Sequence, residues 1–200
     1  MAAPIEFYFD FSSPYGYFAA FKIDEIAARH GRKVNWRPML LGAVFKITGM
    51  APLLNYPIKG DYMKHDWERF SRLFALKWQL PAQFPFVAVN PSRAFYWLHD
   101  RDAELAKRFA KAAYQRAFGD GQEITSAEAT AAAGEAVGVA RAELVAAIND
   151  AAVKDRLRQE VDAAIAAKIF GSPTFVIDGE PFWGADRLDQ VERWLTTGGW

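Results

Sequence analysis

The stretch Ile5-Glu6-Phe7-Tyr8-Phe9-Asp10-Phe11-Ser12-Ser13-Pro14-Tyr15-Gly16-Tyr17 decides the fold of this chain. Its first half is apolar and aromatic, which favours a β-strand over about Ile5–Phe11. Ser13 then stands at a preferred N-cap position, and Pro14 follows at the first helical position, where its missing N–H costs nothing. The stretch therefore predicts a strand that runs directly into a helix whose N-terminus presents Ser13.

The predicted helix start is suited to bind an anion. Free backbone N–H groups, the positive end of the helix dipole and the Ser13 hydroxyl would all face a ligand there. The simpler interpretation is that Ser13 only caps the helix. Because the chain has no cysteine, thiol chemistry at this position needs a thiol from another molecule. Glutathione is the first such ligand to consider.

A second Ser-Pro pair lies far along the chain, in Lys168-Ile169-Phe170-Gly171-Ser172-Pro173-Thr174-Phe175-Val176-Ile177-Asp178-Gly179. Gly171 is typical of a helix stop, and Asp178-Gly179 is typical of a hairpin turn. Because proline cannot donate to a sheet ladder, Pro173 marks the entry of a strand and not its middle.

Hydrophobic periodicity divides the chain into a strand–helix–strand unit, a long helical block and a strand–strand–helix unit. The first unit has a helix that ends at Gly31 and a second strand over 33–41, and its length implies parallel strands. The block should contain an irregular stretch at 42–60, a helix at 61–79, a loop at 80–86, helical sequence at 93–119 with a break near 100–102, and helices from Thr125 to Lys168 with caps at Thr125 and Ser126. The last unit should contain strands at 174–177 and 181–183 and a helix from Asp186 to about Thr196.

Composition predicts one soluble domain and excludes several classes of function. The 200 residues are 52% hydrophobic and carry 24 basic and 24 acidic residues, so the formal net charge is zero. Without a basic stripe we expect no nucleic-acid partner, and without a run of about 18 apolar residues we expect no membrane span. No export signal is visible, so a cytoplasmic location is expected. His30, His65 and His99 are widely spaced, so we expect no metal site.

Several motifs in a fixed order resemble one family. They are FDFSSPYGYF (9–18), WRPMLLGAVF (36–45), IKGDYMKHDW (58–67), LPAQFP (80–85) and FGSPTFVIDGEPFWGADRL (170–188). Together they are similar to the 2-hydroxychromene-2-carboxylate isomerase family, which is related to kappa-class glutathione transferases. The resemblance spans essentially the whole chain.

The resemblance implies an α/β thioredoxin-like fold of the DsbA and kappa-class type. A single domain of residues 1–200 would consist of a thioredoxin-like part, about 1–43 and 169–200, and an all-helical insertion, about 44–168. Pro173 would be a cis-proline that faces the helix start at Ser13. Relatives of this kind also imply a homodimer.

The resemblance further implies a glutathione-dependent cis–trans isomerase of an aromatic acid such as 2-hydroxychromene-2-carboxylate. The thiolate of glutathione would add reversibly to a conjugated double bond, and Ser13 would donate a hydrogen bond to the sulfur. Ser12 is a competing donor one residue earlier. A kappa-like glutathione transferase or peroxidase and a non-catalytic thioredoxin-like binding module are the alternatives.

Five further residues are expected to bind glutathione. Ser172 and Pro173 would meet its cysteinyl part through the backbone. Asp186 would pair with the γ-glutamyl amino group, although a plain N-cap with Asp189 in a capping box is an equal interpretation. Lys59 and Arg187 could contact glutathione or an acidic substrate, or be solvated surface residues.

One departure from the relatives weakens the expected glutathione contacts. Kappa-class proteins carry an asparagine after a Ser-Gly or Thr-Gly pair, whereas this chain has Met50 after Thr48-Gly49. That contact is therefore lost or moves to Asn55.

A flat aromatic substrate would need an apolar slot and a cation. The aromatic candidates are Tyr15, Phe84, Phe86 and Trp183, although each could equally belong to the core. Arg37 or Arg93 could meet a substrate carboxylate, and a structural ion pair is the other interpretation of each.

Overall fold

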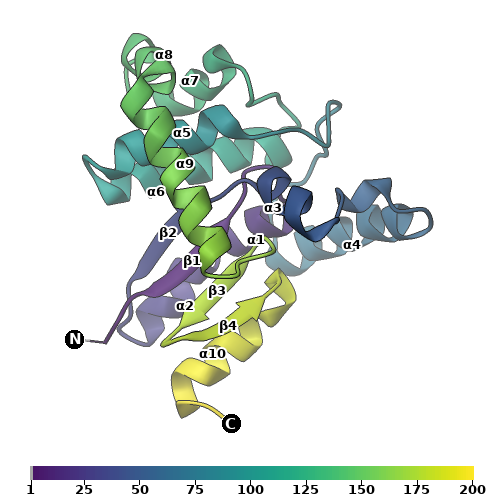
Figure 1. The fold of residues 1–200 in the computed structure, drawn as a ribbon. Coiled ribbons are helices and arrows are strands. Elements are labelled where there is room, and N and C mark those ends of the chain that lie inside the picture. Colours follow the sequence, from purple (N-terminus) through teal and green to yellow (C-terminus); the bar gives the residue numbers. More distant parts are fainter. Residues whose placement is uncertain (1) are drawn as a thin grey trace.

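The computed structural model describes residues 2–200 and contains a mixed four-stranded sheet of order β2-β1-β3-β4 (Figure 1). β1 (Ile5–Phe9) pairs in parallel with β2 (Val34–Pro38) and antiparallel with β3 (Thr174–Ile177). The edge strand β4 (Glu180–Trp183) pairs antiparallel with β3. This is the thioredoxin-like arrangement that the sequence predicts, including the parallel pair around the first helix.

Alternation of buried and half-buried side chains explains why these segments are strands. Along β1, Ile5, Phe7 and Phe9 are fully buried and the residues between them are half-buried. The Phe7 ring packs 5.0 Å from the Trp36 ring of β2 and 5.5 Å from the Phe175 ring of β3. These cross-strand aromatic contacts fix the register of the central strands.

The N-terminal helical segment differs from the prediction of one helix. The chain forms α1 (Pro14–Ala20) and α2 (Ile23–Arg29) with a break between them. The backbone N–H of Lys22, just after α1, donates to the Ala19 carbonyl three residues earlier at 3.0 Å instead of continuing the α-helical pattern. The apolar periodicity continues across this break, so it did not reveal the division.

The stretch 42–60 is not irregular, as the sequence predicts, but contains α3 (Leu41–Thr48) and the 3₁₀ turn η1 (Leu53–Asn55). The first N–H of α3, from Leu41, donates to the Asp10 carboxylate at 2.7 Å. This cap comes from a residue 31 positions earlier, so no local capping signal marks the helix start.

Most of the remaining helices form a block drawn above the sheet in Figure 1, whereas α4 (Lys59–Phe74) lies to its right. The predicted break near 100–102 is confirmed, because the Asp102 side chain caps the next helix. Ser126 is confirmed as a cap, while Thr125 instead bonds Glu123. The elements are α4 (Lys59–Phe74), α5 (Val89–His99), α6 (Ala103–Tyr114), the π-helical turn η2 (Gln115–Gly119), α7 (Ala127–Glu135), α8 (Arg141–Asn149) and α9 (Ala151–Ala166).

The helical block and the sheet share one apolar core. Phe109 and Tyr114 of α6 pack against Phe11, with ring centroids 6.3 and 5.2 Å away, and Phe118 packs 6.0 Å from Tyr17 of α1. The helical block therefore packs directly against the segment that carries Ser13.

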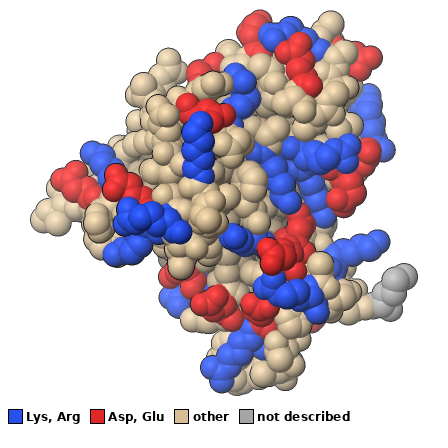
Figure 2. Space-filling view, turned by 180° about the vertical axis from the view of Figure 1, so that it is seen from behind, with Lys and Arg blue, Asp and Glu red and all other residues tan. Residues whose placement is uncertain are grey.

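The surface is electrically mixed. Figure 2 shows lysine and arginine side chains next to aspartate and glutamate over the face that it presents, in keeping with equal numbers of each sign. Within residues 2–200, no helix is long and apolar enough to cross a membrane.

Candidate active site

Ser13 is held at the N-terminus of α1 by hydrogen bonds on both sides of its hydroxyl. Its Oγ accepts from the Gly16 N–H at 3.0 Å, which confirms the N-cap prediction, and donates to the Ser172 carbonyl oxygen at 2.9 Å. Its backbone N–H donates to the Asp10 carbonyl oxygen at 2.8 Å. Ser13 is only 5% exposed, so its hydroxyl is fixed in direction.

The two Ser-Pro pairs meet in the structure. The bond from Ser13 joins positions 159 residues apart, and the Ser172–Pro173 peptide bond is cis, as the resemblance implies. On its other side the loop is fixed by the Gly184 N–H, which donates to the Pro173 carbonyl at 3.0 Å. The cis-proline loop thus faces the start of α1.

Ser172 also contributes its side chain, which the sequence did not predict. The Ser172 Oγ accepts from the backbone N–H of Asp10 at 2.8 Å, and Ser172 is 8% exposed. An apolar residue here would leave the Asp10 N–H without this partner. The polar residue therefore ties the cis-proline loop to the end of β1.

Asp10 is the connecting residue of the site, and the sequence analysis missed it. Its carboxylate accepts from the N–H groups of Ser12 and Leu41, both at 2.7 Å. Its carbonyl oxygen accepts from Ser13 and from the Tyr114 hydroxyl, the latter at 2.8 Å. Burial raises the pKa of Asp10, against the two N–H groups, which lower it. A carboxylate between two aromatic residues at a strand end was the only available signal.

Gly16 is a second residue that the prediction passed over. A Cβ atom at this position would lie 2.5 Å from the Tyr114 hydroxyl and 3.0 Å from the Ser172 Oγ. Contacts this short require a neighbour to move, and Tyr114 is fully buried. Glycine therefore lets α1 approach both Tyr114 and the cis-proline loop.

Tyr15 connects α1 to α4. Its hydroxyl donates to the Asp66 Oδ2 at 2.5 Å, and Asp66 also pairs with Arg69. Burial, followed by the hydrogen bond to Asp66, raises the pKa of Tyr15, so the hydroxyl stays protonated. Its ring lies 5.4 Å from Phe70, edge to face. The Tyr15 side chain thus packs between α1 and α4, close in sequence to Ser13.

Asp186 lies on the same side of the fold as Tyr15. It belongs to the 3₁₀ turn η3 (Ala185–Arg187), which contacts α1, and its charge contributes to the raised pKa of Tyr15. Its side chain is 60% exposed, so the carboxylate is open to a ligand. The capping interpretation is wrong, because α10 (Leu188–Thr197) begins two residues later and has no side-chain cap.

Lys59 is the first residue of α4, so this helix begins two residues earlier than predicted. Its Nζ lies 5.6 Å from the centre of the Tyr56 ring, and no ion pair ties it down within residues 2–200. This contact does not join it to Ser13. Its expected role with glutathione stays a prediction.

No hydrogen bond or ion pair joins the Arg187 side chain to Ser13 within residues 2–200. Its guanidinium lines a pocket between β4 and α10, and its nearest acidic partner is Asp186 at 3.9 Å. Ser13, Ser172 and Pro173 do not line that pocket. The expected role of Arg187 with glutathione stays a prediction.

Of the four aromatic candidates for a substrate slot, two pack into the core. The Phe84 ring lies 5.6 Å from Trp67 and the Phe86 ring 5.9 Å from Phe118. Trp183 instead is 54% exposed. Its indole covers Gly171, where a Cβ atom would lie 2.0 Å from the Trp183 Nε1. Trp183 therefore lies beside the cis-proline loop.

Both arginines considered for a substrate carboxylate have structural partners. Arg37 of β2 pairs with Glu6 of β1 and, at 3.1 Å, with Glu160 of α9. Arg93 turns toward the helical block, where its Nη1 reaches the Ile148 carbonyl at 3.5 Å, and burial lowers its pKa. The ion-pair interpretation therefore holds for Arg37.

The residues that replace the kappa-class asparagine do not lie within the hydrogen-bonded network around Ser13. Met50 packs against the small apolar cluster that contains Met39 and Val44. Asn55 is exposed at the end of η1. No bond connects either to Ser13 or Ser172 within the described residues 2–200.

Comparison with known proteins agrees with this geometry. Residues 4–196 match the family described as DsbA-like thioredoxin domain. A 2-hydroxychromene-2-carboxylate isomerase of Sphingobium xenophagum is 30% identical over 197 residues, which cover 98% of this chain and 99% of that protein. Glutathione S-transferase kappa 1 of Rattus norvegicus is 26% identical and covers 96% of this chain and 92% of its own.

A solved structure of a 2-hydroxychromene-2-carboxylate isomerase superposes with a TM-score of 0.87 at 26% identity, and the match covers 96% of this chain and 94% of that one. Sequence and structure comparisons thus agree over nearly the full length. The chain belongs to the DsbA-like thioredoxin family and, within it, to the group of enzymes that contains the 2-hydroxychromene-2-carboxylate isomerases.

Proposed function

We propose that this enzyme is a glutathione-dependent cis–trans isomerase of an aromatic acid such as 2-hydroxychromene-2-carboxylate. The observation that carries the proposal is the contact between Ser13 and the cis Ser172–Pro173 loop, at a helix N-terminus of a chain without cysteine. A hydroxyl replaces the thiol at the position that performs redox chemistry in thioredoxin-like proteins. An isomerisation needs no net redox change, so the hydroxyl is compatible with it.

The residues around Ser13 suit a bound thiolate. The Tyr15 N–H lies in the first turn of α1, where no intrahelical carbonyl can accept it, and the helix dipole favours a negative charge. Bound glutathione would supply the thiolate that adds reversibly to the conjugated double bond and makes it rotatable. Ser13 would stabilise the charge on sulfur, and Asp186 would offer a carboxylate to the γ-glutamyl ammonium group.

Donation to sulfur requires the Ser13 hydroxyl to turn. Its single proton is engaged by the Ser172 carbonyl oxygen, and a serine hydroxyl has only one proton to donate. When the hydroxyl turns to sulfur, the Ser172 carbonyl becomes free to accept from an amide N–H of the ligand. The exchange keeps the buried carbonyl paired, which limits its cost.

Replacement of Ser13 by alanine tests the proposal. A lost hydrogen bond to a charged acceptor is worth about 1.5–3 kcal/mol, so turnover should fall roughly tenfold to a hundredfold in Ser13→Ala. Ser12→Ala is the first control, because the half-buried Ser12 hydroxyl interacts with the Asp10 carboxylate and has no bond to Ser172 within residues 2–200. Ser126→Ala is the second control, since it removes an equivalent N-cap in α7, where Oγ accepts from Ala129 at 3.1 Å.

Binding of reduced glutathione is the preceding measurement. We expect binding at millimolar concentration by native mass spectrometry, with the ionisation of the bound thiol shifted to lower pH than in free glutathione. Absence of binding would end the proposal. Equal losses of turnover in Ser13→Ala and Ser126→Ala would show that Ser13 acts only as an N-cap.

A cytoplasmic homodimer belongs to the same proposal, and light scattering of the purified chain tests the dimer.

A glutathione transferase reaction is the second candidate function, because a kappa-class transferase covers 96% of this chain. Both reactions would use the same thiolate, and they differ in the electrophile. Turnover of a generic aryl halide without turnover of the hydroxychromene acid would favour the transferase.

A further inference from the structure

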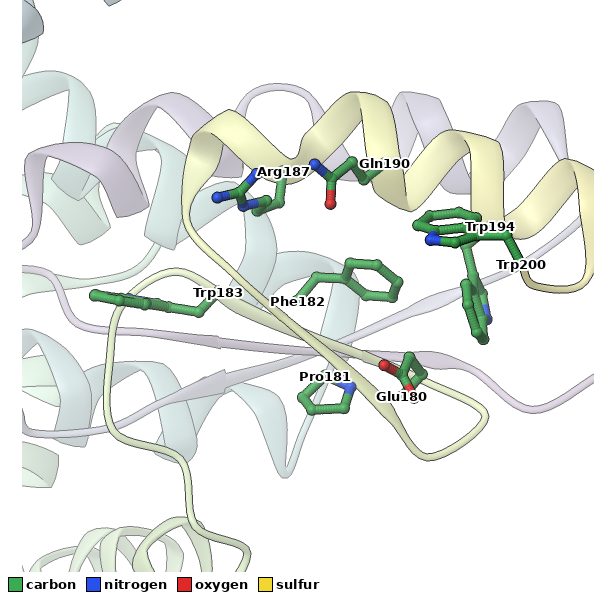
Figure 3. Close-up of a pocket in the computed structure, with 8 residues that line it drawn as sticks. All are labelled: Glu180, Pro181, Phe182, Trp183, Arg187, Gln190, Trp194 and Trp200. Atoms are coloured by element: carbon green, nitrogen blue, oxygen red, sulfur yellow. The ribbon is translucent and has the colours of Figure 1, made fainter.

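A pocket of about 420 Å³ lies between the edge strand β4 and α10, and its lining does not include Ser13, Ser172 or Pro173 (Figure 3). Its Trp183 end adjoins the cis-proline loop, because Trp183 covers Gly171, and its other end is formed by Trp194 and Trp200. Neither the proposed reaction nor the fold itself requires an open pocket here.

Three aromatic residues build one end of this pocket. The Phe182 ring of β4 packs 5.6 Å from Trp194 of α10, and Trp194 packs edge to face with Trp200 at 5.0 Å. Gly198 and Gly199 have φ values of +74° and +130°, which turn the chain back so that Trp200 returns over α10. A Cβ atom at Gly199 would lie 3.2 Å from the Trp194 ring. The aromatic wall therefore depends on this turn.

Polar groups stand at both ends of the aromatic wall. Arg187 extends from η3 and Gln190 from α10, with Arg187 toward the Trp183 end, while Glu180 lies toward Trp194 and Trp200 (Figure 3). The Arg187 side chain makes no hydrogen bond within residues 2–200, and its ion pair with Asp186 is long at 3.9 Å. Its guanidinium donors are thus available to a ligand.

We propose that this pocket binds a planar aromatic carboxylate that carries a hydroxyl group at its far end. The guanidinium of Arg187 would take the carboxylate in the two-point geometry that it favours, with the Gln190 amide beside it. The aromatic ring would pack against Phe182 and Trp194, in the edge-to-face or offset arrangement that aromatic pairs prefer. Glu180 would accept the hydroxyl proton in a hydrogen bond. The lining of this site does not include Ser13, Ser172 or Pro173, and the proposal does not rest on the proposed function of the Ser13 site.

The test uses the full chain without glutathione and 6-hydroxy-2-naphthoate as the probe. The indole N–H signals of the seven tryptophans in ¹H–¹⁵N spectra locate the bound probe. We expect concentration-dependent shifts at Trp194 and Trp200. Trp67, whose ring lies 6.3 Å from Tyr15, should not shift. Shifts at Trp67 without shifts at Trp194 and Trp200 would place the probe at the Ser13 site and overturn the proposal.

Two arginines on neighbouring turns give a matched comparison. Arg187→Gln should weaken probe affinity by about tenfold or more, because a charged hydrogen-bond donor is lost. Arg193→Gln is the control, since Arg193 lies over the outer Trp200 ring at 5.2 Å and does not line the pocket. Equal affinity of wild type and Arg187→Gln for the probe would contradict the proposal.

The chemistry of the ligand is tested with two analogues. 2-Naphthol lacks the carboxylate, so its affinity should be the same for wild type and Arg187→Gln. 2-Naphthoate lacks the hydroxyl, so Glu180→Gln should weaken the binding of 6-hydroxy-2-naphthoate more than the binding of 2-naphthoate. An equal effect of Glu180→Gln on the affinity for both compounds would overturn the assigned role of Glu180. If Arg187→Gln lost as much affinity for 2-naphthol as for 6-hydroxy-2-naphthoate, Arg187 would act only through the shape of the pocket, which would overturn its role as the carboxylate partner.

Discussion

The Tyr114 hydroxyl donates a hydrogen bond of 2.8 Å to the backbone carbonyl oxygen of Asp10 across 104 positions of sequence. Tyr114 ends α6, and Asp10 directly follows β1, the strand that leads to Ser13. The helical block therefore fixes the loop of the candidate active site directly. Burial raises the pKa of Tyr114 well above its ordinary value, so this donor keeps its proton.

Tyr114→Phe should lower the free energy of unfolding by about 0.5–1.5 kcal/mol, the net value of one hydrogen bond. Tyr17→Phe is the matched control, because the Tyr17 hydroxyl also donates to a backbone carbonyl, that of Lys77, at 2.6 Å. Both variants should lose similar stability in urea unfolding. Only Tyr114→Phe should also lower turnover, because only its bond holds the Ser13 loop. Equal turnover in the two variants would show that the bond contributes to stability alone.

Gly16→Ala should destabilise the protein by about 1–3 kcal/mol, as expected when a methyl group enters a packed core. The contact at fault is the one of 2.5 Å with the Tyr114 hydroxyl. The double variant Gly16→Ala/Tyr114→Phe removes that oxygen, so it should recover part of the lost stability. A double-mutant cycle of urea unfolding energies measures this coupling. Strictly additive losses would mean that the crowding lies elsewhere.

The sequence predicted the elements that local signals mark. Ser13, as an N-cap before Pro14, and Gly171-Ser172-Pro173, as a strand entry, each carry their signal within a few residues. The start of α3 at Leu41 and the role of Asp10 depend on a contact between positions 31 apart. No local pattern could show that contact.

The division of roles among the candidate binding residues was also beyond local patterns. Asp186 and Arg187 are adjacent in sequence, yet one contributes to the raised pKa of Tyr15 and the other lines the pocket at β4. The 3₁₀ turn between β4 and α10 causes this divergence. The sequence predicts a continuous helix from Asp186, and that prediction gives no sign of the difference between the two residues.

Arg37→Met tests the structural interpretation of this arginine. The guanidinium joins Glu6 in the sheet to Glu160 in α9, and these three side chains are 32%, 26% and 11% exposed. We expect the free energy of unfolding to fall by about 1–2 kcal/mol, a value between those for exposed and buried ion pairs. Arg158→Met, at an exposed pair with Asp155, should cost less. A raised KM for the aromatic acid at unchanged stability would instead assign Arg37 to substrate binding.

Asp10→Asn should change how stability depends on pH. Burial raises the pKa of Asp10 in the folded protein above the ordinary carboxyl value of about 3.9. The folded state therefore binds this proton more tightly than the unfolded chain does. The resulting stabilisation is fully present below the ordinary pKa and is lost as the pH rises through the folded pKa.

Urea unfolding of wild type and Asp10→Asn over a series of pH values from about 3 to 7 measures this effect. The wild-type free energy of unfolding, relative to the variant, should fall as the pH rises above about 4. Asp178→Asn is a control of opposite sign, because the hydrogen bond from Arg32 lowers the pKa of Asp178, and its stabilisation is lost as the pH falls. A wild-type advantage over Asp10→Asn that stayed constant or grew with pH would show that the N–H groups of Ser12 and Leu41 outweigh burial.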